Sequence, residues 1–287
     1  MNHTAAMHRP SGPTFAVAFG GGGARGLAHI HVIETLDELG IHPVMIAGSS
    51  IGAIMGAGMA AGMRGAEIHA YARAILGRRA ELASRIWRAR PGSLTEMFER
   101  GIRVGQFNIE RILGAFLPDE IPETFGELGI PLRVTGTDYY GHCLAVFDSG
   151  DLRSALAASA AIPAVFQPVT RDGRLYIDGG IYNPVPFDLV EGIADITIAI
   201  DVVGAPTEGQ RRPTSIDLMF GATQLMMQSI NDTKLRQSAP QILLRPPVSA
   251  FRALDFLKVE TVLHETRAIR DELKREIEKA VAACAAG

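Results

Sequence analysis

Two strand–loop–helix units near the N-terminus constrain the fold of this chain more than any other feature. Residues 14–19 (TFAVAF) have the pattern of a buried strand, and a run of glycines separates them from apolar residues that recur every third position between Leu27 and Leu39. A second apolar run at 44–47 (VMIA) precedes a helix of small residues. Strand–helix–strand units of this kind build parallel sheets covered by helices. The sequence therefore predicts a three-layer α/β/α fold with a mostly parallel central sheet.

The rest of the chain continues the alternation of strands and helices. We predict strands at 131–137, 143–148, 196–203 and 241–245, a helix at 151–161, a hairpin within 165–180 that turns at Asp172-Gly173, and one long amphipathic helix at 255–285. We expect a disordered tail at 1–13 and a single catalytic domain at 14–287. Within that domain, 64–116 form a helical insertion that acts as a cap, and 204–287 are mostly helical.

Composition and charge limit the kinds of partner that this chain can bind and the cellular compartment that suits it. The formal net charge of −3 supplies no positive field, which argues against a nucleic-acid partner. Cys143 and Cys284 match no zinc or redox spacing and fit reduced thiols. Residues 44–63 carry no charge, but their Gly and Ala content makes insertion into a bilayer unfavourable. We predict a cytoplasmic protein without a transmembrane segment, with a peripheral position at the inner membrane as a further hypothesis.

The glycine loop at 20–26 (GGGGARG) directs backbone N–H groups at something negative, either a bound phosphate or an oxyanion formed during a reaction. Its G-x-G-x-x-G spacing suits a dinucleotide, but that fold needs an acidic residue after the second strand, where residues 47–50 read AGSS. A P-loop needs a lysine in the loop, and the first lysine of this chain is Lys234. A turn without a ligand accounts for one or two glycines, not for four in a row.

The second loop offers a nucleophile. Residues 48–52 (GSSIG) fit G-x-S-x-G, in which Ser50 occupies a sharp strand-to-helix turn and Gly48 and Gly52 relieve crowding. Loops that follow two parallel strands emerge at the same sheet edge, so the Ser50 hydroxyl and the glycine-loop N–H groups can meet there. This arrangement favours a transient oxyanion as the anion. Ser49 is expected to form a hydrogen bond within the turn.

A serine nucleophile needs a base, and the histidines are poorly placed to provide one. His264 lies on the predicted C-terminal helix, where a surface position is the simpler interpretation, and His29 and His31 lie inside the first helix. Asp178 ends a predicted strand and precedes two glycines, which would leave its carboxylate at the sheet edge. A partly desolvated carboxylate can take a serine proton. From the residues alone, a simple turn cap at Asp178 is an equal alternative.

These segments resemble the patatin-like phospholipase family in its bacterial single-domain form. The resemblance rests on the ordered motifs GGGGARG (20–26), GSSIG (48–52), SAAIPAVFQPV (159–169) and DGRLYIDGGIYNPVP (172–186), and it covers about residues 14–203. The chain departs from the family pattern at Ala164, where the family often has glycine. That difference bears on packing more than on chemistry.

The resemblance implies a Ser–Asp dyad without a catalytic histidine, in which Ser50 is the nucleophile and Asp178 the base, supported by Gly179 and Gly180. It assigns to the oxyanion-hole loop the residues Gly21, Gly22, Gly23, Arg25 and Gly26. The implied chemistry is hydrolysis of acyl esters in phospholipids, lysophospholipids and other glycerolipids, with no metal and no cofactor. Arg25 has two candidate roles, orienting a phosphate head group or holding the glycine loop by pairing with a carboxylate, and we favour the second.

Membrane contact and the identity of the acyl acceptor stay open at this point. Residues 64–103 hold nine Arg and four Glu around Trp87, a local net charge of +5. We take contact of this region with an anionic lipid surface as a hypothesis, with solvated helix faces as the alternative. Besides hydrolysis, the motifs leave room for an acyltransferase, a nucleotide-binding regulatory protein or an inactive scaffold.

Overall fold

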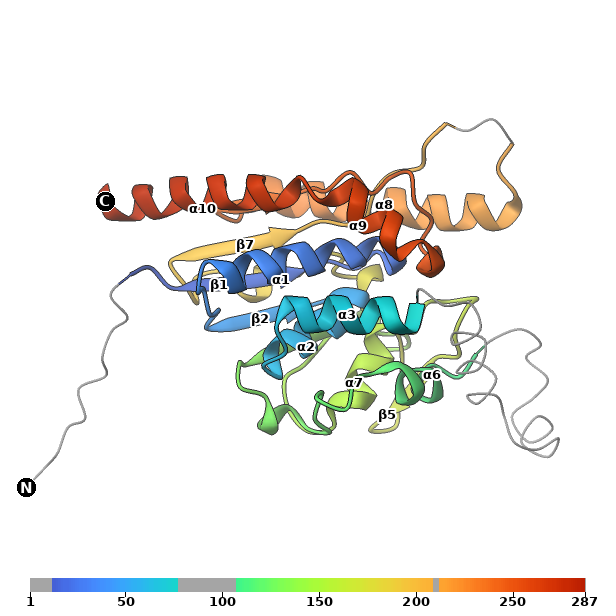
Figure 1. The fold of residues 1–287 in the computed structure, drawn as a ribbon. Coiled ribbons are helices and arrows are strands. Elements are labelled where there is room, and N and C mark those ends of the chain that lie inside the picture. Colours follow the sequence, from blue (N-terminus) through green and yellow to red (C-terminus); the bar gives the residue numbers. More distant parts are fainter. Residues whose placement is uncertain (1–11, 77–106, 209–211, 287) are drawn as a thin grey trace, which may run out of the picture.

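The centre of the molecule is one sheet that helices cover (Figure 1). The computed structural model describes residues 12–76, 107–208 and 212–286. The strands in these residues are β1 (Phe15–Phe19), β2 (Met45–Gly48), β3 (Leu132–Asp138), β4 (Cys143–Phe147), β5 (Val169–Arg171), β6 (Arg174–Asp178), β7 (Ile196–Ile200) and β8 (Ile242–Leu244). Their order is β5-β6-β3-β2-β1-β7-β8, and β4 also pairs with β3. Strands β3-β2-β1-β7-β8 are parallel, whereas β4, β5 and β6 form antiparallel pairs, so the mostly parallel sheet is confirmed.

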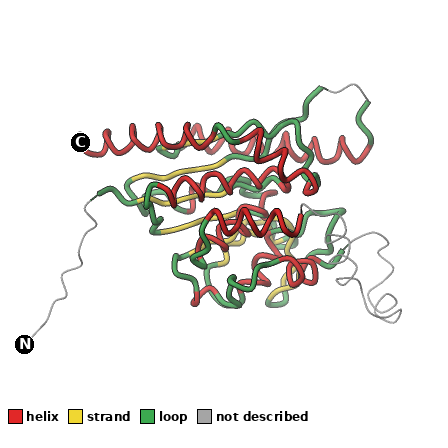
Figure 2. The backbone as a smooth tube through the Cα atoms, viewed as in Figure 1, coloured by secondary structure: helices red, strands yellow, loops and turns green. Residues whose placement is uncertain are grey.

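Helices lie on both faces of this sheet (Figure 2). Those in the described residues are α1 (His29–Glu38), α2 (Ile51–Ala60), α3 (Gly65–Leu76), α6 (Ile109–Phe116), α7 (Leu152–Ser159), α8 (Ser215–Gln237), α9 (Val259–Thr266) and α10 (Ile269–Ala286). The larger hydrophobic core joins one face of the sheet to α1, α2, α7 and α10. Helix α8 and residues 185–190 contribute to a smaller core on the opposite face. The three layers predicted from the sequence are therefore present.

Strand β1 shows why both faces must be covered. All five of its residues are buried, and successive side chains point to opposite faces. Phe15, Val17 and Phe19 enter the larger core, whereas Ala16 and Ala18 enter the smaller one. Large side chains on one face and alanines on the other account for the unequal sizes of the two cores.

The predicted hairpin and the predicted small-residue helix are both confirmed. Asp172 and Gly173 join β5 to β6 with φ angles of 50° and 75°, the left-handed pair that a two-residue primed turn requires. The uncharged stretch at 44–63 folds as β2 and α2, both largely buried. In the described part of the chain, no helix combines the length and hydrophobicity needed to cross a bilayer.

The single helix predicted at 255–285 is wrong, because the chain breaks between α9 and α10. At the break, His31 Nε2 donates to the Leu263 carbonyl at 2.8 Å, and Thr266 Oγ1 donates to the Val262 carbonyl at 2.7 Å. The Arg267 amide turns instead to the His264 carbonyl. His31 therefore occupies the Leu263 carbonyl, which would accept from the Arg267 amide in a continuous helix.

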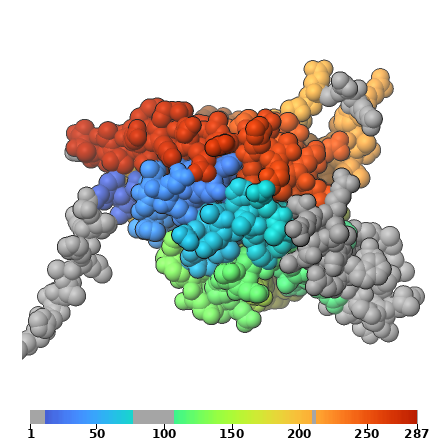
Figure 3. Space-filling model, viewed as in Figure 1, coloured from blue at the N-terminus to red at the C-terminus, as the bar shows by residue number. Residues whose placement is uncertain are grey.

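The break allows α10 to lie along α1, and Figure 3 shows the C-terminal segment lying directly on the N-terminal one. Lys274 Nζ lies 2.9 Å from Glu38 Oε2, and Arg270 pairs with both Glu34 and Glu38. Helix α1 therefore lies between the sheet and α10. Of the predicted insertion at 64–116, α3 and α6 are described, whereas Trp87 and most of the arginines lie outside the described residues, as does most of the predicted tail at 1–13.

Candidate active site

Ser50 occupies a strained turn between β2 and α2. Its φ and ψ angles are 53° and −125°, a conformation that costs a non-glycine residue energy and is concentrated at functional sites. The Ser50 amide donates to Ser159 Oγ at 2.8 Å, and the Gly52 amide donates to the Ser49 carbonyl at 2.8 Å. A Cβ at Gly52 would lie 2.2 Å from the Phe19 carbonyl oxygen, so α2 can start this close to β1 only with glycine there.

Asp178 reaches Ser50 from the end of β6. Ser50 Oγ donates to Asp178 Oδ2 at 2.6 Å, and the Gly180 amide donates to Asp178 Oδ1 at 2.8 Å. The carboxylate thus caps the following turn and accepts from the serine, so the two interpretations of Asp178 are compatible. Asp178 is 7% exposed, and this burial raises its pKa to about 6, against the opposing effect of the hydrogen bonds from Ser50 and Gly180.

The backbone around Asp178 is fixed from β3. Thr137 Oγ1 donates to the Asp178 carbonyl at 2.8 Å. A Cβ at Gly179 would lie 2.3 Å from Thr135 Oγ1, and one at Gly180 would lie 3.0 Å from Asp178 Oδ1. The two glycines therefore let the chain turn against β3 without displacing the carboxylate.

The glycine loop lies against the turn that carries Ser50 (residues 48–52, called the elbow below), as the topology predicted. A Cβ at Gly21 would lie 3.3 Å from Ser50 Cβ, and one at Gly26 would lie 2.3 Å from Ile51 Cγ2. The Gly21 amide donates to the Pro184 carbonyl at 2.8 Å and is therefore occupied. The amides of Gly22 and Gly23 have no acceptor among the described residues. Gly23 has a φ of +60° and lines the same cavity as Ser50.

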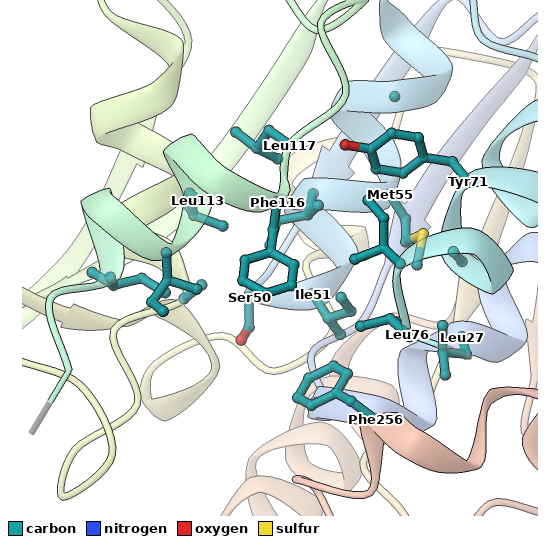
Figure 4. Close-up of a pocket in the computed structure, with 18 of the residues that line it drawn as sticks. Leu27, Ser50, Ile51, Met55, Tyr71, Leu76, Leu113, Phe116, Leu117 and Phe256 are labelled. Atoms are coloured by element: carbon teal, nitrogen blue, oxygen red, sulfur yellow. The ribbon is translucent and has the colours of Figure 1, made fainter. Parts of the chain in front are cut away.

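The cavity in front of Ser50 is apolar and has a volume of about 440 Å³. Its walls include residues of α2, α3 and α6, together with Leu254, Phe256 and Leu257 from the segment before α9. Figure 4 shows Ser50 among leucine, isoleucine, methionine and phenylalanine side chains from these elements. The Ser50 hydroxyl, which is hydrogen bonded to Asp178, thus faces a cavity whose apolar walls suit a hydrocarbon ligand.

A sequence model described as "Patatin-like phospholipase" matches residues 17–190, which is more than half of the chain. The chain belongs to the patatin-like phospholipase family. An uncharacterized NTE family protein of Mycobacterium tuberculosis is 39% identical over 197 residues, covering 68% of this chain and 51% of that protein. Human patatin-like phospholipase domain-containing protein 6 is 25% identical over 291 residues, covering 88% of this chain and 20% of that protein. The chain therefore spans about half of the first relative and a fifth of the second.

Solved structures show a more distant likeness. VipD from Legionella pneumophila aligns with a TM-score of 0.44 at 17% identity, covering 80% of this chain and 55% of that chain. Human GIVD cytosolic phospholipase A2 aligns with a TM-score of 0.44 at 10% identity, covering 94% of this chain and 60% of that chain.

Arg25 holds the glycine loop of this patatin-like chain, but not through a carboxylate. Its side chain is buried, and Nε donates to the Phe251 carbonyl at 2.8 Å while a terminal nitrogen donates to the Val203 carbonyl. Burial lowers the pKa of Arg25 to about 10, although Asp255 acts in the opposite direction. The expected carboxylate partner is wrong, since backbone carbonyls from two distant segments take its place. These hydrogen bonds connect the glycine loop to the residues that follow β7 and to the segment before α9.

The histidines have structural positions, as expected. His29 is fully buried, its Nε2 donates to the Gly20 carbonyl at 2.8 Å, and burial lowers its pKa to about 4, so the ring is neutral. His264 is exposed on α9. Ser50 Oγ donates to Asp178, and in the described residues no histidine is bonded to either of them.

The sequence did not predict the surroundings of two serines close to Ser50. Ser49 Oγ is buried and has no hydrogen-bond partner among the described residues, so Ser49 takes part in the turn through its carbonyl, which accepts from the Gly52 amide, and not through its hydroxyl. Ser159, which had no predicted role, accepts from the Ser50 amide and is fully buried. Only its place in the SAAIPAVFQPV motif marked it. Within the described residues, no three His, Cys, Asp or Glu side chains are grouped closely enough to hold a metal ion, and Cys143 and Cys284 are free and exposed.

Proposed function

We propose that this chain is a serine lipid acyl hydrolase that cleaves acyl esters of phospholipids, lysophospholipids or other glycerolipids with a Ser50–Asp178 dyad. The observation that carries the proposal is the 2.6 Å hydrogen bond from Ser50 Oγ to a buried carboxylate at the edge of an apolar cavity. Membership of the patatin-like phospholipase family supports a lipid hydrolase. The human relative is named for a phospholipase domain, and another relative, from Debaryomyces hansenii, is named a lysophospholipase.

In the proposed reaction Asp178 takes the Ser50 proton as Ser50 Oγ attacks the ester carbonyl carbon. The oxyanion of the tetrahedral intermediate accepts from backbone amides, for which Gly22, Gly23 and Ile51 are the candidates because their N–H groups have no acceptor among the described residues. The C–O bond to the alcohol then breaks, and Asp178 returns the proton to the leaving oxygen. An acyl-Ser50 ester remains.

Water completes the cycle by the same steps in reverse order. Asp178 takes a proton from water, the hydroxide oxygen attacks the acyl carbon, and the ester bond to Ser50 Oγ breaks as the proton returns to that oxygen. The products are a fatty acid and a free Ser50. A pKa of about 6 keeps Asp178 mostly ionised near neutral pH, yet close enough to neutrality for efficient proton transfer.

We place this reaction in the cytoplasm, at a membrane surface that supplies the lipid. A surface position is consistent with the described residues, which contain no helix suited to crossing a bilayer. Contact through the arginines of 64–103 stays a hypothesis. It predicts weaker binding to anionic liposomes after Arg78, Arg79, Arg85 and Arg88 are changed to glutamine.

The test compares p-nitrophenyl ester hydrolysis by the wild type, Ser50→Ala and Asp178→Asn, with the intact mass measured after a fluorophosphonate probe. We expect both variants to lose at least about 10³-fold in kcat/KM, since one removes the nucleophile and the other the base. Ser49→Ala is the matched control, because its hydroxyl is buried beside Ser50 without a partner in the described residues. It should keep its activity and the probe adduct.

Two results would contradict the dyad: a folded wild type that neither hydrolyses esters nor gains the adduct, or a Ser50→Ala protein as active as the wild type. Product analysis with and without an added alcohol distinguishes hydrolysis from transfer to an acceptor other than water.

A further inference from the structure

The apolar cavity follows the whole length of α2, starting at Ser50. Its lining includes Ile51, Ile54, Met55 and Gly58, and spacings of three and four residues place them on one face of that helix. α3 and α6 each contribute a stripe with the same spacing: Ile68, Tyr71, Ala72, Ile75 and Leu76 from α3, and Ile109, Ile112, Leu113 and Phe116 from α6. In Figure 4 the labelled side chains of these three helices point toward one another. The space between them is therefore elongated along α2.

The two ends of this space differ in exposure. Leu254 lies next to Ala253, whose carbonyl approaches Gly23 at the nucleophile end, and Leu254 is 47% exposed. At the other end, Met63 and Ile68 are 7% and 8% exposed. A Cβ added to Gly58 would lie 3.3 Å from Ile68 Cδ1 and 3.6 Å from Met63 Sδ. The nucleophile thus lies toward the exposed end, and Gly58 belongs to the buried end.

On the basis of the hydrolase function proposed above, we infer that this cavity holds one acyl chain of the substrate and that Gly58 sets the chain length that fits. The side chains lining the space offer a hydrocarbon chain apolar contact along its whole length. An acyl carbonyl at Ser50 Oγ directs its chain along α2, toward Gly58. Because Gly58 has no side chain, the last methylenes of the chain meet only the flexible ends of Ile68 and Met63 beside it, which can move aside for them.

Helix geometry gives the scale of this selection. Gly58 lies eight positions after Ser50, which at a rise of about 1.5 Å per residue is a distance of about 12 Å. An extended chain advances about 1.2 Å per bond, since an extended peptide covers roughly 3.5 Å in three bonds. Gly58 therefore lies beside about the tenth carbon of a chain that begins at Ser50. Shorter chains end before Gly58, and longer chains pass it.

The test measures kcat/KM for p-nitrophenyl butyrate, octanoate, dodecanoate and palmitate with the wild type and Gly58→Leu. The new side chain occupies the space beyond about the tenth carbon, and each methylene left out of a buried site costs about fourfold in kcat/KM. We expect Gly58→Leu to keep butyrate and octanoate hydrolysis within about twofold and to lose at least about tenfold for dodecanoate and palmitate. Ile68→Ala, which enlarges the same end, should shift the preference toward palmitate.

Gly114→Leu is the matched control, because Gly114 lies on α6 outside the cavity lining and a Cβ there meets nothing within 4 Å. It should leave the chain-length profile unchanged. A folded Gly58→Leu protein, verified by circular dichroism, that loses activity equally on all four esters would overturn the inference, as would an unchanged profile.

Binding separates this inference from the proposed function. Octanoate and palmitate are titrated into Ser50→Ala and into Ser50→Ala/Gly58→Leu, with no reaction required. Weaker palmitate binding with unchanged octanoate binding supports the inference, even if the wild type hydrolyses no ester and the proposed function fails. Equal palmitate binding by the two proteins overturns it.

Discussion

At its N-terminal end, α2 meets a turn in which every polar atom of Ser50 is hydrogen bonded, whereas Gly58, near its C-terminal end, lies against apolar side chains. The Ser50 amide donates to Ser159, its hydroxyl donates to Asp178, and its carbonyl accepts from the Ala53 amide at 2.9 Å. Around Gly58 the neighbours are the ends of flexible apolar side chains. The same ten-residue helix therefore combines a site that tolerates almost no displacement with one that can accommodate an added methyl group.

The two ends of α2 differ in how closely an added Cβ would approach its neighbours, at Gly52 near one end and at Gly58 near the other. A Cβ at Gly52 would lie 2.2 Å from the Phe19 carbonyl and 2.6 Å from the Gly20 carbonyl, both backbone atoms of the sheet and the glycine loop. The three atoms nearest to a Cβ at Gly58 would belong to the Ile68 and Met63 side chains, at 3.3 Å or more. An identical substitution at the two positions should therefore have opposite effects.

The largest effect is expected for Gly52→Ala. The added methyl group must push α2 away from β1, which we expect to lower the free energy of unfolding by at least about 3 kcal/mol. The shift also displaces Ser50, and a displacement of about 1 Å from the reacting geometry costs about 10²-fold in rate. Urea denaturation and kcat/KM for a short ester measure both. An unchanged denaturation midpoint with full activity would show that the start of α2 is less constrained than its contacts indicate.

The Asp178→Asn variant tests how much stability the protein loses by burying the ionised Asp178 carboxylate. Burial raises the folded-state pKa of Asp178 from 3.8 to about 6, so the ionised form is disfavoured by folding. The stability that Asp178 contributes is full below about pH 3.8 and is lost as pH rises through about 6, a change of up to about 3 kcal/mol. The asparagine variant should therefore be more stable than the wild type at about pH 8 and no more stable at about pH 3.5.

The pH dependence of the wild-type rate gives a second measurement of the same carboxylate. Because the ionised form acts as the base, kcat/KM should fall about tenfold per pH unit below about pH 6. Asp178→Asn should lose this dependence along with its activity, whereas Ser49→Ala should keep it. A wild-type rate that stays flat down to about pH 4 would contradict both the raised pKa and the assignment of Asp178 as base.

The geometry at the Ser50 end of α2 could be predicted from the sequence because its determinants are local and topological. GSSIG placed Ser50 on a turn, parallel pairing brought the loops after β1 and β2 to one edge, and the glycines after Asp178 indicated a turn there. The partners that stabilise this end were not predictable in the same way. Ser159 is one of two serines in an alanine-rich helix, and the carbonyls that hold Arg25 lie 178 and 226 residues away.

The C-terminal helices show a second limit of the sequence. Apolar residues recur with helical spacing through 255–285, and this periodicity alone predicts a continuous helix. The break after α9 depends on His31, which belongs to α1 and bonds the Leu263 carbonyl across the fold. Periodicity reports the face that a helix buries, but it carries no information on a donor that arrives from another element.

The smallest expected effect, and the one that completes the comparison within α2, is that of Gly58→Ala. Gly58 lies inside the helix, where alanine is favoured over glycine by up to about 1 kcal/mol. Its added methyl group needs a shift of only a few tenths of an ångström from Ile68. We therefore expect Gly58→Ala to raise the free energy of unfolding by about 0.5–1 kcal/mol, with octanoate ester hydrolysis unchanged. A loss of stability in urea denaturation would mean that the far end of the cavity is as rigid as the elbow, and chain-length selection by Gly58 would then lose its structural basis.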